Sequence, residues 1–209
     1  MTYDVLESKI FPVTVFKTQV PDNNLIKESL VDKISYNAKY LTIPEHWTTD
    51  RVKTSYESEP EGMELLEKDS EYQKLLVEKY NTCFNNIFKI DYQISIGNIW
   101  YNYYDNGEYQ EEHDHIGTLF NPAHFSCIHF LSFDPDQHKC PQFRDPICQI
   151  RNFSLEIGQN RCDEIYEPKI KEGDFLMFPS YLKHRVPAGK PTKYPRITLS
   201  FNIAVLLYD

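Results

Sequence analysis

The stretch that most constrains the fold is residues 195–207, PRITLSFNIAVLL. Apolar and polar residues alternate along it, as in a β-strand whose two faces differ. One face carries Arg196, Thr198, Ser200 and Asn202. The other carries Ile197, Leu199, Phe201 and Ile203. A guanidinium suits a carboxylate, so the polar face could line an anion-binding interior, or it could be the solvent side of a sheet. The strand alone leaves both interpretations open.

The same period of two extends over the second part of the chain. It predicts strands at 91–104, 124–133, 149–157, 164–170, 174–178 and 195–207. Turn-forming residues separate these segments, and residues 134–148 have the composition of a loop. Many short strands at such intervals are typical of a sandwich, a barrel or a jelly roll.

The first part of the chain is mostly helical in pattern. A strand is predicted within 10–20, helices over 23–40 and 62–88, and a loop over 41–60. The apolar stripe of the second helix should pack against a sheet. We therefore expect one mainly β domain over residues 1–209, with 1–90 as a helical support and 91–209 as the β core.

Composition and charge limit the function classes. Hydrophobic residues make up 41% of the chain and charged residues 25%, which predicts a packed core. The net charge is -9, and no dense basic run appears, which argues against nucleic acid as a partner. A peptide or a small molecule suits this charge better.

The sequence also bears on location. No apolar stretch reaches the roughly 18 residues needed to span a bilayer, and residues 1–15 lack the apolar core of a signal peptide. The five cysteines include no C-x-x-C pair, which favours reduced thiols over a disulfide framework. We expect a soluble, cytoplasmic protein without a membrane segment.

Two segments carry histidines that could bind a metal. In an extended segment, His113 and His115 project to the same side and form a two-imidazole clamp. His184 follows an apolar strand and Pro179. Each feature by itself is more often an ordinary surface histidine. For His124, His129 and His138 we expect hydrogen-bonded core or surface roles.

Taken in order, these segments resemble the 2-oxoglutarate/iron(II)-dependent oxygenases, especially the prolyl-4-hydroxylase-like group and related oxygenases of phages and bacteria. The resemblance rests on YDNGEYQEEHDH (104–115), FRDP (143–146), GDFLMFPSYLKH (173–184) and RITLSFN (196–202). It covers roughly residues 92–206. It implies a double-stranded β-helix, the jelly roll of cupins, and is compatible with a phage-encoded protein in a bacterial host.

The resemblance includes one departure. The family usually carries Asp or Glu two residues after the first histidine, where this chain has His115. Three histidines, His113, His115 and His184, could bind the metal. Alternatively Asp114 could supply a carboxylate, although strand alternation points it away, or one ligand could be missing. We expect the three-histidine arrangement.

The resemblance also implies the remaining roles. Iron(II) would bind 2-oxoglutarate and dioxygen, and the enzyme would hydroxylate a peptide residue or a small molecule while forming succinate. Arg196 would bind the distal carboxylate of 2-oxoglutarate, with Thr198 assisting. Tyr104 and Asn102, on one strand face, would also reach the co-substrate, although Tyr104 could equally be a packed core residue.

Two other functions remain compatible with the sequence. A cupin-like metalloenzyme could use three histidines without 2-oxoglutarate, which would leave Arg196 without a carboxylate partner. A non-catalytic jelly-roll binding module would contain the same histidines as structural residues.

Overall fold

A computed structural model describes residues 13–44, 52–88, 92–117, 122–148 and 164–207. The helices are α1 (Asn23–Asn37) and α2 (Glu71–Ile87). The strands are β1 (Phe16–Gln19), β2 (Lys53–Thr54), β3 (Tyr92–Ile96), β4 (Trp100–Asn106), β5 (Gln110–His113), β6 (Phe125–Ser132), β7 (Gln142–Arg144), β8 (Ile165–Tyr166), β9 (Asp174–Pro179), β10 (His184–Val186) and β11 (Pro191–Leu207). Neither described helix has the length and apolar character required to cross a bilayer.

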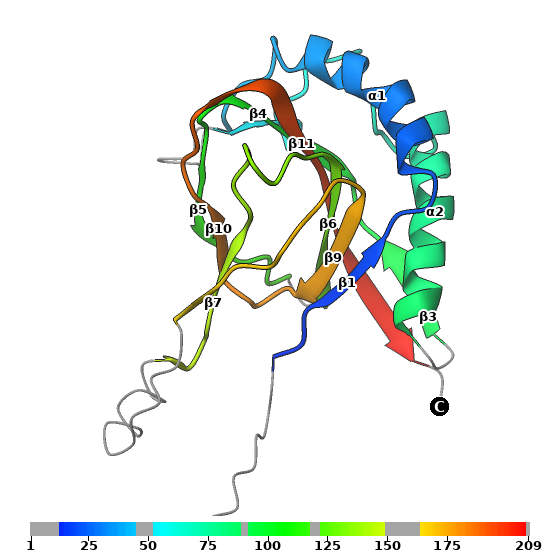
Figure 1. The fold of residues 1–209 in the computed structure, drawn as a ribbon. Coiled ribbons are helices and arrows are strands. Elements are labelled where there is room, and N and C mark those ends of the chain that lie inside the picture. The colour runs from blue at the N-terminus through cyan, green and yellow to red at the C-terminus, as the bar shows by residue number, and fades with distance from the viewer. Residues whose placement is uncertain (1–12, 45–51, 89–91, 118–121, 149–163, 208–209) are drawn as a thin grey trace, which may run out of the picture.

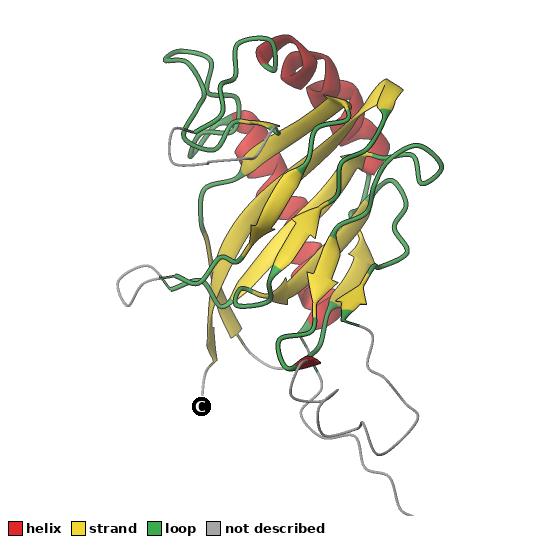
Figure 2. Ribbon diagram, turned by 90° about the vertical axis from the view of Figure 1, so that its left-hand side faces the viewer, coloured by secondary structure: helices red, strands yellow, loops and turns green. Residues whose placement is uncertain are grey.

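The strands form two antiparallel sheets. The major sheet has the order β1-β9-β6-β11-β4-β2, with β3 paired to the far end of β11. The minor sheet has the order β5-β10-β7-β8. Figure 1 shows the minor sheet facing the inner side of the major sheet, while both helices lie on the outer side of the major sheet. Figure 2 shows the strands from a view turned by 90°. This architecture confirms the predicted double-stranded β-helix with supporting helices.

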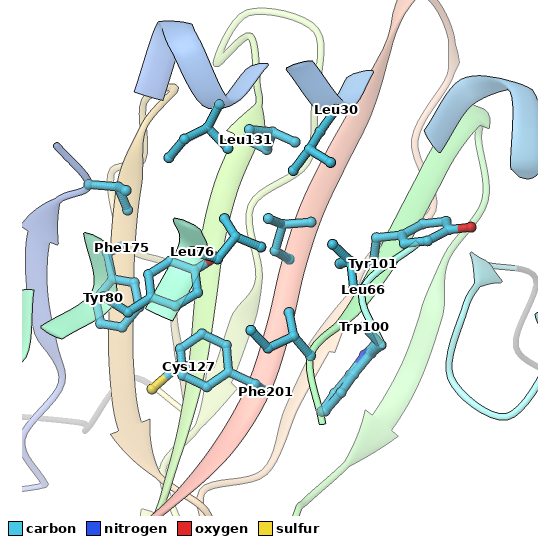
Figure 3. Close-up of a cluster of buried hydrophobic side chains, with 14 of the residues drawn as sticks. Leu30, Leu66, Leu76, Tyr80, Trp100, Tyr101, Cys127, Leu131, Phe175 and Phe201 are labelled. Atoms are coloured by element: carbon cyan, nitrogen blue, oxygen red, sulfur yellow. The ribbon is translucent and has the colours of Figure 1, made fainter. Parts of the chain in front are cut away.

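Strand β11 is buried on both faces. Its apolar residues Ile197, Leu199 and Phe201 are fully buried in the core under the helices. Figure 3 shows this core, in which Leu30 of α1 and Leu76 and Tyr80 of α2 lie over the sheet. The polar residues of β11 point toward the interior, and Arg196 is only 3% exposed. The polar face is therefore an interior surface and not the solvent side.

Several predicted boundaries were wrong. The helix predicted at 62–88 begins only at Glu71, because Ser70 caps it by accepting a hydrogen bond from the Gln73 backbone N–H at 3.1 Å. The helix predicted at 23–40 ends at Asn37, and the strand predicted at 91–104 is divided into β3 and β4. The predicted loops at 41–60 and 134–148 contain the short strands β2 and β7. The strand predicted at 149–157 lies outside the described residues.

His129 joins the major sheet to both helices. It is fully buried, its Nδ1 lies 3.1 Å from Tyr80 Oη, and its Nε2 lies 2.7 Å from Asn23 Oδ1. An amide oxygen only accepts, so Nε2–H donates to Asn23 and Nδ1 accepts from the Tyr80 hydroxyl. Burial lowers the pKa of His129 to about 3, which keeps the ring neutral.

His129 should make the fold sensitive to acid. Unfolded histidine titrates near pH 6.5, so between pH 6.5 and about 3 the unfolded chain takes up a proton that the native chain does not. The free energy of unfolding should therefore decrease as the pH is lowered through this window. In His129→Gln the slope of the unfolding free energy against pH should be smaller, corresponding to up to one proton fewer taken up on unfolding. Urea denaturation between pH 4.5 and 7.5 measures this slope. A slope identical to that of the wild type would contradict this role.

Candidate active site

Three histidines converge between the two sheets. His113 ends β5 and lies directly opposite His184, the first residue of β10. His115 continues the chain in extended form, and its backbone N–H donates to the Ser180 carbonyl at 2.9 Å. One ring nitrogen from each histidine lies within 4.8 Å of those of the other two. The three imidazoles could therefore hold one metal ion.

Backbone carbonyls fix the rings of two of these histidines. His113 Nδ1 lies 2.8 Å from the Glu111 carbonyl oxygen, and His184 Nδ1 lies 3.0 Å from the Leu182 carbonyl oxygen. A carbonyl only accepts, so each Nδ1 carries the proton and each Nε2 keeps its lone pair. This is the arrangement that metal-binding histidines commonly use.

Aromatic side chains hold the other ring faces. The indole of Trp100 stacks on His115 with centroids 5.9 Å apart, and Phe178 lies 4.8 Å from His184. Burial, reinforced by the adjacent His113, lowers the pKa of His115 to about 4. The same effects lower the pKa of His184 well below its ordinary value. These two rings are neutral at physiological pH and available to a cation.

Asp114 does not join the three histidines. Its carboxylate accepts a hydrogen bond from the Ile116 backbone N–H at 3.3 Å, and the clustered ligand atoms come from histidines only.

On the outer side of the minor sheet, Arg144 Nε donates to Glu112 at 2.6 Å and Nη1 pairs with Glu164. This ion pair connects β5 to β7 across the intervening β10.

All seven residues predicted for the site line one hollow: Asn102, Tyr104, His113, His115, His184, Arg196 and Thr198. The register of β11 on β4 explains this, because Arg196 faces Tyr104 and Thr198 faces Asn102 across the strand pair. The turn at Gly107, with φ of 79°, then returns the chain toward the hollow so that Gln110 and His113 also reach it.

Arg196 places a buried cation beside the hollow. Its Nε and Nη1 are fully buried and make no hydrogen bond with any described residue. The guanidinium carbon lies 4.4 Å from the ring centre of Tyr104 and 5.8 Å from that of Phe130. These rings hold the cation in place but do not accept its N–H bonds. Such a group fits an anionic ligand entering from the hollow.

The sequence interpretation missed part of the lining. Trp100 shares the inward face of β4 with Asn102 and Tyr104, so strand alternation could have revealed it. Ser126 also lines the hollow, but short hydroxyl residues carry no distinctive sequence signal. His124 accepts a hydrogen bond from the Val205 backbone N–H, and both nitrogens of His138 are within 3.0 Å of backbone groups. These two histidines and His129 do not line the hollow. His46 lies outside the described residues.

Known proteins share the sequence pattern and the fold of this chain. A family model described as "Putative 2OG-Fe(II) oxygenase" matches residues 98–202. A prolyl-4-hydroxylase from Pseudomonas putida is similar in structure, with a TM-score of 0.54, 13% identity, and coverage of 91% of this chain and 92% of that one. HygX from Streptomyces hygroscopicus, solved with nickel and 2-oxoglutarate, gives a TM-score of 0.57 at 10% identity, covering 92% and 83%.

A prolyl hydroxylase from Trichoplax adhaerens, in complex with a hypoxia-inducible-factor peptide fragment, gives a TM-score of 0.60 at 10% identity, covering 90% of this chain and 82% of that one. No curated protein sequence matches the chain. At these identities the structural matches establish the fold, while the family model covers half of the sequence.

The unpaired guanidinium should reduce the stability of the ligand-free protein. Arg196→Met removes the buried charge while keeping a long apolar stem against Tyr104 and Phe130. We expect the free energy of unfolding without ligand to rise by about 1–3 kcal/mol in urea denaturation. Lys193→Met, an exposed cation on the same strand, should change it by less than about 0.5 kcal/mol. A less stable Arg196→Met variant would contradict the assignment.

Proposed function

The chain belongs to the 2OG-Fe(II) oxygenase family, and on that premise we propose that it hydroxylates a substrate while converting 2-oxoglutarate and dioxygen to succinate and carbon dioxide. The observation that carries this proposal is the placement of three metal-ready imidazoles and an unpaired buried guanidinium around one hollow. The former can hold a cation and the latter an anion, which together suit a metal and a dicarboxylate.

His113, His115 and His184 are the proposed iron(II) ligands. Imidazole nitrogens suit first-row transition metals, and three protein ligands would leave coordination positions for 2-oxoglutarate and dioxygen. Once bound, iron(II) would bring 2-oxoglutarate and dioxygen together for oxidative decarboxylation and hydroxylation. Backbone carbonyls orient the rings of His113 and His184, and burial keeps His115 and His184 unprotonated.

Arg196 is the proposed partner of the distal carboxylate of 2-oxoglutarate. Its buried Nε–H and Nη1–H groups are free to donate charge-assisted hydrogen bonds to a carboxylate. Thr198 lies two residues along on the same inner face and offers a hydroxyl. The guanidinium of Arg196 lies over the ring of Tyr104, and the amide of Asn102 lines the same hollow.

The substrate class remains a peptide side chain or a small molecule. Among structurally similar proteins, one was solved with a peptide fragment and HygX was also solved with hygromycin B. We further propose that residues 1–209 form one catalytic domain, since α1 and α2 pack into the same core as the major sheet.

A metalloenzyme that does not use 2-oxoglutarate is the second candidate. It is favoured by the absence of a carboxylate from the three-histidine cluster in the described part of the chain. Under that function Arg196 would have no role in turnover.

The proposal predicts iron-dependent formation of succinate coupled to consumption of dioxygen. Arg196→Ala should raise the KM for 2-oxoglutarate by about 10- to 100-fold, since a charge-assisted hydrogen bond contributes roughly 1.5–3 kcal/mol. His113→Ala, His115→Ala and His184→Ala should each lower turnover by at least about 100-fold. The measurements are an oxygen electrode and chromatographic quantification of succinate.

Controls come from neighbouring residues outside the hollow. Lys193→Ala removes an exposed cation from β11, and Asp114→Asn removes the carboxylate between two of the proposed ligands; neither should change the KM for 2-oxoglutarate appreciably. Iron-dependent oxygen consumption without succinate would favour the second candidate. If the His115→Ala variant forms succinate at the wild-type rate, His115 is not a metal ligand.

A further inference from the structure

The inner face of β11 continues beyond the proposed co-substrate position. Arg196, Thr198 and Ser200 on this face are each at most 8% exposed. Asn202, the fourth polar residue in the row, is partly exposed and also lines the hollow. The inner face therefore meets solvent at the Asn202 end, and a substrate can enter there.

The length of the strand separates this end from the co-substrate. Six residues of β-strand span roughly 20 Å, whereas four carbon–carbon bonds limit 2-oxoglutarate to about 6 Å between its carboxyl carbons. The guanidinium of Arg196 stays beside Tyr104, its direct neighbour across the strand pair. A co-substrate held there ends well before Asn202.

The amide of Asn202 is oriented by one neighbour and otherwise unused. Asn202 Oδ1 accepts a hydrogen bond from Ser126 Oγ at 2.9 Å, and Ser126 Oγ also lies 3.2 Å from Ser180 Oγ. The Nδ2 group donates to no acceptor among the described residues. With Oδ1 engaged, two N–H donors remain for an acceptor brought by a ligand.

Asn202 is also on the histidine side of the hollow. Ser180, which contacts Ser126, accepts a hydrogen bond from the His115 backbone N–H through its carbonyl. The residues that follow His115 and Ser180 are Ile116 and Tyr181, which are 67% and 51% exposed. The donors of Asn202 thus lie near a rim that offers apolar contacts.

We propose that Asn202, oriented by Ser126, binds a carbonyl oxygen of the primary substrate. This inference rests on the proposed function, since it takes the opposite end of the hollow to hold 2-oxoglutarate. The carbonyl can come from a peptide backbone or from the amide of a small molecule. Asn202 acts in substrate recognition and takes no part in holding the metal or the co-substrate.

The test uses the full chain with Mn(II) and 2-oxoglutarate and two probes, N-methylacetamide and the peptide acetyl-Gly-Gly-Gly-amide. Binding is followed by the paramagnetic relaxation enhancement of the probe protons, titrated against probe concentration. In Asn202→Ala and Asn202→Asp the affinity should fall about 3- to 10-fold, the effect of losing one or two hydrogen bonds. Ser126→Ala, which frees the amide to rotate, should give a smaller loss.

Each outcome decides the matter. If the peptide gives the stronger relaxation enhancement and the Asn202 variants lose it, the substrate is a peptide. If both probes give equal enhancement, the substrate is a small amide. Full binding by Asn202→Asp would overturn the donor role, and no enhancement in the wild type would overturn the site. The EPR signal of free Mn(II) reports metal binding separately, so failure to bind Mn(II) would be recognised as failure of the proposed function itself, which overturns both.

Discussion

The structure depends on the burial of both faces of β11. One face must be covered by apolar partners, which α1 and α2 supply through Leu30, Leu76 and Tyr80. The other face carries polar groups into the interior, including a guanidinium whose buried N–H bonds have no described acceptor. Burying such a group is unfavourable without a partner. The guanidinium therefore lowers the stability of the ligand-free protein, as expected for a strand that supplies a binding site.

The candidate metal centre is built on the less extensive of the two sheets. Strand β5 has four residues and, among the described strands, pairs with β10 alone, where His113 and His184 are direct neighbours. The ion pair between Arg144 and Glu112 supplies a second connection across that sheet. The proposed metal ligands and the proposed anion-binding strand thus lie on opposite sides of the hollow, which is where a metal-bound dicarboxylate would fit.

The strand pattern restricted the fold to a sandwich, a barrel or a jelly roll, and the family resemblance of the histidine segments and residues 196–202 selected the jelly roll. The seven candidate residues that the resemblance indicated line one hollow. The sequence could not decide whether the polar face of β11 is buried, because that depends on the minor sheet, which comes to lie opposite this face only in the tertiary structure. It also missed β7, since three residues between prolines carry too little periodicity. The partners that fix the rings, the carbonyls of Glu111 and Leu182, are backbone groups and leave no mark in the sequence.

The central claim is that the three histidines and Arg196 hold a metal and 2-oxoglutarate together. An anaerobic titration with iron(II) and 2-oxoglutarate tests it most directly, through the weak visible metal-to-ligand charge-transfer absorption of the chelate. The account predicts a band that requires both additions in the wild type and needs higher 2-oxoglutarate concentrations in Arg196→Ala. Iron bound without any such band, or a band unaffected by loss of Arg196, would contradict it.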